Sequence, residues 1–333
     1  MGNTISFPGL GLNFTINPVA FTIGSFPINW YGIIIAVGLL LAMLYGMKRS
    51  KEFNVSVDNL SDIIIFSIIF GVIGARLYYV LFYIDDTGAN PYFSNLLSVF
   101  DFRSGGLGIY GGIIAAFLTA FVVCRIKKIS FGAVADIAGL GFLIGQAIGR
   151  WGNFVNQEAY GSTTSMPWGM LVSGSSTPVH PCFLYESLWC VLGFAILHIY
   201  SKRRKFNGEI FLMYIAWYSF GRFFIEGLRS DSLMLGNLKV SQLIAAIFFI
   251  AACVLLVYKR VKIKEHVEQE TAEYNSLFED ASKAVEIDTM EAAKKYMLDE
   301  QEDGGNDEPA NPDVEQTQSD AELGTEEKPE EKD

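Results

Sequence analysis

The stretch from Gly149 to Gly161 places charged and amide side chains where a long apolar segment ends. It reads Gly-Arg-Trp-Gly-Asn-Phe-Val-Asn-Gln-Glu-Ala-Tyr-Gly and contains Arg150, Asn153, Asn156 and Glu158. An arginine next to hydrocarbon must be satisfied by a partner, by water or by an anionic ligand. The planar guanidinium group matches a phosphate better than a point charge does. The block therefore indicates a site for an anion at one end of a buried segment.

A second polar row runs from Tyr218 to Arg229. Tyr218, Arg222 and Glu226 follow one another at intervals of four residues, so they share one face if the segment is a helix. Arg229 continues the same row. An ion pair between Arg222 and Glu226 would account for these two residues without any ligand.

Two more arginines, Arg76 and Arg150, lie in separate apolar segments. Burying each of them near the bilayer costs about 2.5 to 3.5 kcal/mol on insertion scales. An excess of arginine over neighbouring carboxylates therefore favours an anionic ligand, such as a phospholipid head group, over purely structural ion pairs.

The composition places the chain among membrane proteins. Its 333 residues are 51% apolar and include 26 phenylalanines, which no ordinary soluble domain matches. A helix needs roughly 20 apolar residues to cross a bilayer. Seven segments reach that length, so we expect an all-α membrane protein with seven transmembrane helices at about 28–47, 63–84, 105–124, 131–151, 183–200, 210–228 and 240–258.

Basic residues gather after the first, third, fifth and seventh of these segments. They are Lys48, Arg49 and Lys51; Arg125, Lys127 and Lys128; Lys202, Arg203, Arg204 and Lys205; and Lys259, Arg260, Lys262 and Lys264. The connections on the other side hold only Arg103, Arg229 and Lys239. Because short cytoplasmic loops carry an excess of lysine and arginine, we expect residues 1–27 to be external and the carboxyl terminus to be cytoplasmic.

With this orientation, most polar residues of the spans fall in the outward half of the membrane. They come from six different segments: Tyr31, Arg76, Tyr110, Arg150, Asn153, His180, Tyr185, Glu186, Tyr218, Arg222 and Glu226. Gly105, Gly106 and Gly108 lie at the same level, where they suit either tight helix packing or a lipid pocket. Asp136 lies toward the cytoplasm and is interpreted as either a helix-start residue or a site member.

The carboxyl-terminal segment differs from the rest of the chain. Residues 264–333 contain 24 Asp or Glu against 6 Lys or Arg, a net charge of −18 that leaves +7 for residues 1–263 out of the total of −11. From about residue 299 onward the segment is also rich in Gly, Pro and Asn and cannot bury enough apolar surface to fold. We expect a largely disordered cytoplasmic tail, in which residues around 283–298 could form a short helix. A solvated appendage is favoured over a specific partner-binding role.

Cysteine and histidine are too scattered to form a metal site. Cys124, Cys182, Cys190 and Cys253 contain no Cys-x-x-Cys pair, and His180, His198 and His266 lie far apart in sequence. We therefore expect no metal, no other cofactor and no nucleic-acid partner.

The Gly149–Gly161 block resembles the signature of the bacterial prolipoprotein diacylglyceryl transferase family. The resemblance extends over roughly residues 28–260. Asn29-Trp30-Tyr31-Gly32 and the Tyr218–Arg229 row resemble two other blocks of the family. His180-Pro181 with Leu184-Tyr185-Glu186 resembles a fourth block, from which Cys182 and Phe183 depart.

The resemblance implies an enzyme of the bacterial cell membrane with its active site facing outward, in a catalytic domain over residues 28–263. The enzyme would transfer the diacylglyceryl group of phosphatidylglycerol to the thiol of a lipobox cysteine in a prolipoprotein. A thioether forms and glycerol phosphate is released. Guanidinium groups would stabilise the departing phosphate more in the transition state than in the ground state.

The site residues follow from the same resemblance. Arg222 is expected to stabilise the leaving group, with Tyr110, Glu226 and Tyr218 as further catalytic residues. Lipid binding is assigned to Arg150, Asn153, Asn156, Glu158, Gly161, Arg76, Tyr31 and Arg229. His180, Tyr185, Glu186 and Asp136 are expected to support them.

Tyr110 departs from the family, whose pattern has a histidine there. A tyrosine with a reference pKa near 10 is a poor base at neutral pH, so orientation of a substrate is the favoured role. The thiol, with a pKa near 8.5 in water, would then be ionised by the arginines or by Glu226.

A transporter and a seven-helix receptor or retinal protein are the alternatives. The seven segments form no evident pair of inverted repeats, which argues against the common transporter plan. The last segment, Val240 to Tyr258, contains no lysine for a Schiff base.

Overall fold

Each of the seven predicted segments contains a helix in the computed structural model. The structure describes residues 3–84, 90, 92, 98–99, 105–230, 233–236 and 238–302. The helices are α1 (Trp30–Arg49), α2 (Val57–Phe82), α4 (Ile109–Ile126), α5 (Phe131–Asn156), α6 (Cys182–Ser201), α7 (Glu209–Leu228) and α8 (Val240–Glu302). The chain forms two units, Met1–Lys264 and Glu265–Asp333, which are described separately.

Six of the described helices are long and apolar enough to cross a membrane: α1, α2, α4, α5, α6 and α8. The seventh, α7, is not, because Arg222 and Glu226 lower its mean hydropathy. Large apolar side chains remain exposed along the outer faces of the helices, among them Leu40, Ile114 and Leu192. Such faces suit contact with lipid tails. The first unit is therefore a multi-pass membrane protein.

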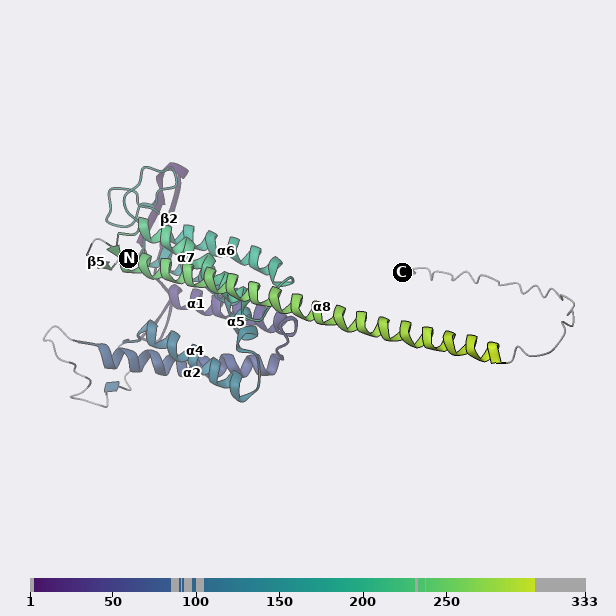
Figure 1. The fold of residues 1–333 in the computed structure, drawn as a ribbon. Coiled ribbons are helices and arrows are strands. Elements are labelled where there is room, and N and C mark those ends of the chain that lie inside the picture. The colour runs from purple at the N-terminus through teal and green to yellow at the C-terminus, as the bar shows by residue number, and fades with distance from the viewer. Residues whose placement is uncertain are drawn as a thin grey trace, which may run out of the picture. The chain divides into compact units, whose positions relative to one another are not determined.

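The helices of the first unit pack in two groups (Figure 1). In one group α2 lies along α4, and in the other α5 contacts α1, α6 and α7. Small residues allow close approach within the first group: a Cβ atom on Gly74 would lie 2.8 Å from the carbonyl oxygen of Gly111. This is the small-residue contact typical of membrane helices.

Two tryptophans join α6 to α7. The rings of Trp189 and Trp217 stack with centroids 4.3 Å apart, and each indole N–H donates to the other residue's carbonyl oxygen at 2.9 and 3.0 Å. Gly193 and Gly221 make room for them, because a Cβ atom on either glycine would lie within 2.3 Å of an indole nitrogen. The two helices are therefore held in a single register.

Asp136 caps a helix other than its own. Its fully buried carboxylate accepts hydrogen bonds from the backbone N–H groups of Gly208 (2.8 Å) and Phe211 (2.9 Å) at the start of α7. The start of α5 is capped by Ser130 instead. Asp136 thus stabilises the start of α7 and lies at the opposite end of α5 from Arg150. The prediction that Asp136 serves the start of a helix is confirmed, but the helix is α7 and not α5.

The amino-terminal segment contains strands, which the all-α expectation missed. β1 (Asn3–Phe7) pairs with β2 (Leu12–Ile16) after the 3₁₀ turn Pro8–Leu10, and β3 (Val19–Ile23) pairs with β4 (Phe26–Asn29). A third short hairpin joins β5 (Met234–Leu235) to β6 (Leu238–Lys239).

The first hairpin packs on the end of α5. Alternation along β1 buries Ile5 and Phe7, which join Phe154, Met170 and Phe183 in an apolar cluster. Ser6 and Leu171 exchange backbone hydrogen bonds of 3.1 and 2.7 Å. The segment after α5 is therefore clamped between α5, α6 and the amino-terminal hairpin.

The second unit is helical as far as Glu302, which corrects the expectation of disorder over 264–302. This part of α8 is rich in Ala, Glu, Lys and Met, which have high helix propensity. His266 pairs with Glu270 one turn further along at 3.2 Å. The composition predicted that this segment buries little apolar surface, and its side chains are indeed exposed. A helix can nevertheless form without burial. Residues 303–333 lie outside the described part of the chain.

Candidate active site

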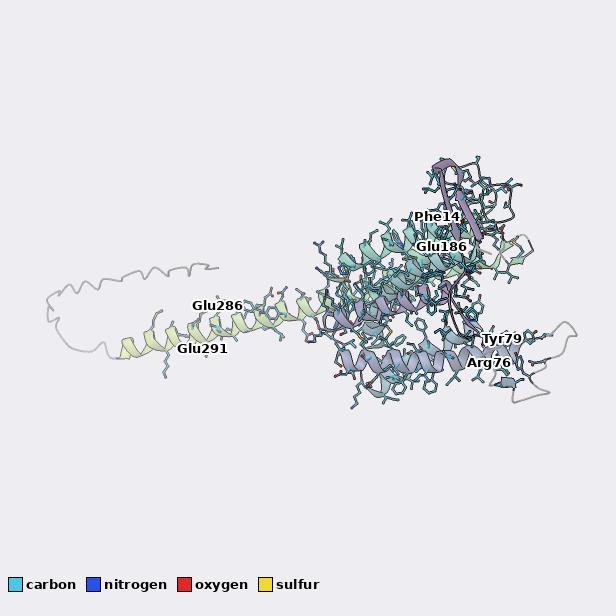
Figure 2. All side chains as sticks on the ribbon, turned by 180° about the vertical axis from the view of Figure 1, so that it is seen from behind. Phe14, Arg76, Tyr79, Glu186, Glu286 and Glu291 are labelled. Atoms are coloured by element: carbon cyan, nitrogen blue, oxygen red, sulfur yellow. The ribbon has the colours of Figure 1, made fainter. Side chains whose placement is uncertain are left out.

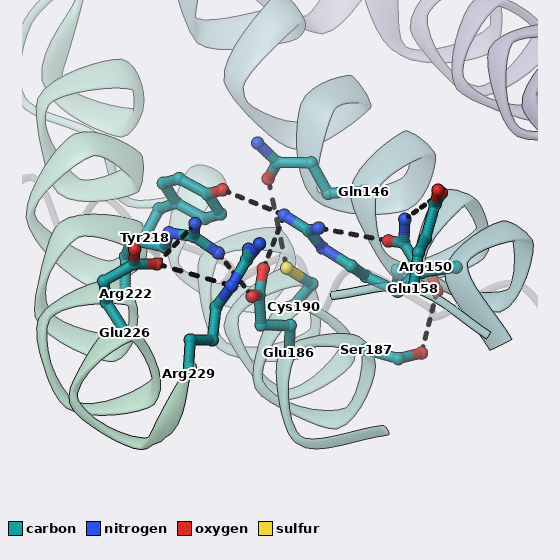
Figure 3. Close-up of polar contacts among 12 residues, drawn as sticks. Gln146, Arg150, Glu158, Glu186, Ser187, Cys190, Tyr218, Arg222, Glu226 and Arg229 are labelled. Atoms are coloured by element: carbon teal, nitrogen blue, oxygen red, sulfur yellow. Dashed lines mark hydrogen bonds and ion pairs between the residues drawn. The ribbon is translucent and has the colours of Figure 1, made fainter. Parts of the chain in front are cut away.

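Glu186 connects three helices through two arginines. Its carboxylate oxygens lie 2.5 Å from Arg150 Nη2 on α5 and 2.5 Å from Arg222 Nη1 on α7. Figure 3 shows both guanidinium groups converging on this carboxylate. Sequence analysis assigned Glu186 only a supporting role, whereas the structure makes it the centre of the charged cluster.

The row of charges continues along α7. Arg222 Nη2 lies 2.6 Å from Glu226 Oε2, and Arg229 Nε lies 3.9 Å from the same oxygen. Among the described contacts, the cluster therefore alternates cation and anion through Arg150, Glu186, Arg222, Glu226 and Arg229.

Burial differs between the two signs of charge. The side chains of Glu186 and Glu226 are 5% and 2% exposed, whereas those of Arg150, Arg222 and Arg229 are 21%, 18% and 14% exposed. The two carboxylates are buried, and each of the three guanidinium groups keeps an edge that is accessible to solvent. This arrangement can bind an anion with fixed, charge-assisted donors.

Intervals of four residues bring further polar groups to the cluster. Gln146 lies one turn before Arg150 and donates to Tyr214 Oη at 2.9 Å. Cys190, one turn after Glu186, contacts Gln146 Oε1 at 3.9 Å, and Tyr218 Oη lies 3.5 Å from Arg150 Nη2. Sequence analysis missed Gln146 and Cys190, although their spacing to Arg150 and Glu186 was the available signal.

The end of α5 orients Arg150. Arg150 Nη1 donates to Asn153 Oδ1 at 3.2 Å, and Asn153 Nδ2 donates to Glu158 Oε1 at 2.9 Å. Asn156 Nδ2 reaches the same Glu158 oxygen at 3.5 Å. Gln157 ends the helix in the left-handed conformation with φ 54°, which turns Glu158 back toward the two asparagines. The block is thus a relay of side chains that fixes one guanidinium group.

Gly161 serves packing. Its N–H donates to the His180 carbonyl at 2.9 Å, and it forms a β-bridge with Arg229. A Cβ atom there would lie 2.7 Å from His180 Cβ, so only glycine allows this segment to lie against the end of α7.

Three aromatic or histidine residues assigned to the site lie around the cluster. The ring of Tyr31 packs on Gly152 of α5, where a Cβ atom would lie 2.6 Å from the ring. Tyr185 Oη accepts from Trp168 Nε1 at 2.7 Å and lies 3.2 Å from His180 Nδ1.

An apolar groove of about 460 Å³ lies between α6 and α7. Tyr185, Trp189, Phe220, Phe224 and Leu228 are among its lining residues. Because Glu186 and Glu226 are on the neighbouring faces of the same helices, the groove runs beside the charged cluster.

Arg76 and Tyr110 belong to the other helix group. Arg76 is 2% exposed and donates to the carbonyl oxygens of Ser98 (2.7 Å), Val99 (2.7 Å) and Gly105 (2.8 Å). Figure 2 shows Arg76 on a separate part of the helix body from Glu186. Arg76 therefore holds the chain that leads into α4, and the cationic site expected from sequence loses one of its arginines.

Tyr110 is 61% exposed at the start of α4. Its nearest aromatic partner is Tyr78, at 6.3 Å between ring centroids. Among the described contacts, none joins Tyr110 to Arg150 or Arg222. The side chain is thus accessible to a substrate but separate from the arginine cluster.

The described residues contain no group of three His, Cys, Asp or Glu side chains that could hold a metal ion. The cluster itself offers fixed cations and hydrogen-bond donors. Apolar helices around a cluster of arginines and buried carboxylates define a multi-pass membrane protein with a polar site inside its helix bundle.

The comparisons with known proteins identify the family. The model of the prolipoprotein diacylglyceryl transferase family matches residues 18–258. The phosphatidylglycerol–prolipoprotein diacylglyceryl transferase of Clostridioides difficile is 44% identical over 252 residues, covering 76% of this chain and 99% of that protein. The same enzyme of Finegoldia magna is 45% identical, covering 74% and 97%. The chain belongs to the prolipoprotein diacylglyceryl transferase family.

Because Glu186 pairs with two arginines, removal of its charge should strongly lower the stability of the protein. Glu186→Gln leaves Arg150 and Arg222 without their shared counter-ion, and breaking a buried pair in this way costs about 3 to 5 kcal/mol. We expect a lower midpoint of thermal unfolding in detergent. Glu158→Gln removes a charge from an exposed side chain and should cost about 1 kcal/mol. Equal losses in the two variants would contradict the central role of Glu186.

Proposed function

We propose that this protein transfers the diacylglyceryl group of phosphatidylglycerol to the thiol of a lipobox cysteine in prolipoproteins. Family membership supports the reaction, and the observation that carries it is the cluster of three arginines with accessible edges above two buried carboxylates. The apolar groove between α6 and α7 suits an acyl chain beside the phosphate site.

The chemistry accounts for a cationic site. The sulfur of the precursor attacks the glyceryl carbon that carries the phosphate, the carbon–sulfur bond forms, and the carbon–oxygen bond breaks. Its electron pair goes to the phosphate oxygen, so a phosphodiester with one negative charge becomes glycerol phosphate with about two. Arg222 and Arg150 stabilise this added charge, which exists only as the transition state is approached.

The proton of the thiol needs an acceptor or a cationic surrounding. Glu226 lies 2.6 Å from Arg222 and Glu186 lies against two arginines, so both carboxylates already serve as counter-ions. The arginine edges favour the thiolate of the incoming cysteine, as cationic surroundings do for reactive cysteines in general. The liberated proton then passes to water or to a buffer base. Tyr110 orients one of the substrates.

All seven helices cross the bacterial cell membrane, with residues 1–27 and the active site outside and the carboxyl terminus in the cytoplasm. The distribution of lysine and arginine supports this orientation. α7 spans despite its charges because Arg222 and Glu226 pair inside the bundle, which offsets their insertion cost.

A transfer assay with purified protein, acyl-labelled phosphatidylglycerol and a lipobox peptide tests the function. We expect label on the peptide with the native protein. Arg222→Lys keeps the charge but loses the fork that contacts Glu186 and Glu226 together, so it should lower kcat by about 100-fold or more, the range for removing one transition-state donor. Lys283→Gln, on the exposed part of α8, is the control. Label that stays in the lipid with folded native protein would reject the transferase function.

Tyr110→Phe distinguishes orientation from base catalysis. The phenol is exposed and separate from the arginines, so its loss should reduce kcat/KM by less than about tenfold, the value of one hydrogen bond to a substrate. The pH profile should stay unchanged. A loss of about 100-fold or more, with a shifted profile, would make Tyr110 a base.

Deletion of residues 270–333 should leave the transfer rate unchanged. The family match ends at residue 258, and 76% of this chain is enough to cover 99% of the C. difficile relative. The rate of the truncated protein in the same assay measures the effect. A slow but stably inserted truncation would give the tail a role in the reaction.

A further inference from the structure

A second cavity lies at the other end of the helices from the charged cluster. It has a volume of about 400 Å³ and is lined by Ser201, Lys202, Arg204 and Lys205, by Phe206, and by Glu52 after α1. α6 begins near Glu186 and ends at Ser201, and α7 begins at Glu209 and ends near Arg229. Apart from Glu52, the cavity is therefore lined by the end of α6 and the loop that leads to α7, and it shares no residue with the candidate active site.

The arginine in this cavity is held in place. Its guanidinium carbon lies 4.2 Å from the ring centroid of Phe53, which is fully buried. Arg204 Nη2 donates to the Glu52 carbonyl oxygen at 3.0 Å. The guanidinium group is thus fixed at the cavity wall before any ligand arrives.

Two of the carboxylates near the cavity have other cations. Glu52 Oε1 lies 2.6 Å from Arg49 Nε, and Glu209 Oε1 lies 2.5 Å from Arg260 Nη2. Asp136, which accepts from backbone N–H groups at the start of α7, is close enough to Arg204 for an electrostatic interaction. Within the described residues, no carboxylate forms an ion pair with Lys202 or Lys205, so these two cations are available to an external anion.

A role in membrane orientation explains basic residues here but not their arrangement. The positive-inside effect depends on charge alone, whereas this loop encloses a cavity and fixes one guanidinium group on a buried aromatic ring. Basic pockets at the cytoplasmic ends of membrane helices bind the head groups of anionic lipids, and an arginine with two lysines fits a phosphate ester.

We propose that the cavity between Glu52 and the Ser201–Phe206 loop is a binding site for a phosphate ester, separate from the active site. A lipid head group of the adjacent leaflet and a soluble glycerol phosphate share this chemistry. Binding joins the end of α6 to the start of α7, the two helices that carry Glu186 and Arg222 at their other ends. It therefore stabilises the helix pair on which the charged cluster is built.

Thermal unfolding of the full-length protein in non-ionic detergent tests the site. The probes are dioleoyl phosphatidic acid, dioleoyl phosphatidylcholine and glycerol 3-phosphate. The pocket variant is Lys202→Gln with Lys205→Gln, and the control is Lys294→Gln with Lys295→Gln, which removes the same charge from an exposed helix. We expect phosphatidic acid to raise the midpoint of the native protein and of the control. Its apparent affinity for the pocket variant should be about 30-fold weaker, from the loss of two lysines near the phosphate.

The outcomes separate the ligand sources. Protection by phosphatidic acid but not by glycerol 3-phosphate supports a lipid, and protection by both supports a site that also accepts the soluble ester. Equal protection of the pocket variant and the native protein, or equal protection by phosphatidylcholine, overturns the proposal. If the pocket variant does not purify, a photoactivatable phosphatidic acid replaces it: labelling of residues 201–207 supports the site, and absence of labelling there overturns it, whatever else is labelled.

Discussion

The buried carboxylate of Glu186 is the constraint on which the rest of the site depends. A carboxylate that is 5% exposed inside a membrane protein must have counter-ions, because the cost of removing it from water exceeds what one weak contact returns. Arg150 and Arg222 meet this need from two different helices. The requirement for charge balance therefore fixes α5, α6 and α7 relative to one another, and it places the guanidinium groups where a phosphate can reach them.

Other contacts among α5, α6 and α7 also hold the arginines next to Glu186. The stacked tryptophans set the register of α6 against α7, and Asp136 ties the start of α7 to α5 at the far end. With both ends of α7 attached, the row from Tyr218 to Arg229 cannot rotate away from Glu186. Preorganised donors of this kind need no rearrangement when charge develops on a leaving phosphate.

The two helix groups divide the polar residues between folding and chemistry. Arg76 donates to backbone carbonyl oxygens before α4. The cluster on α5, α6 and α7 instead pairs its arginines with buried carboxylates and leaves an accessible edge on each guanidinium group. The groups that an arginine contacts thus distinguish the structural Arg76 from the arginines suited to the reaction, although all lie in apolar segments of similar composition.

The sequence by itself determined the helices, the face shared by Tyr218, Arg222 and Glu226, and the family, because hydropathy, spacing and signature are local properties. Apolar runs of roughly 20 residues and intervals of four residues are visible without knowing any neighbour. The β1–β2 hairpin and the helical part of the tail outside 283–298 were missed, since a count of apolar residues reports burial and not backbone pairing or helix propensity. Only the tertiary structure decided which partner each charge takes: Glu186 between two arginines, Asp136 at the start of α7, and Arg76 outside the cluster. The physical reason is that ion pairs and caps between helices depend on distances across the bundle, and no spacing along the chain encodes those distances.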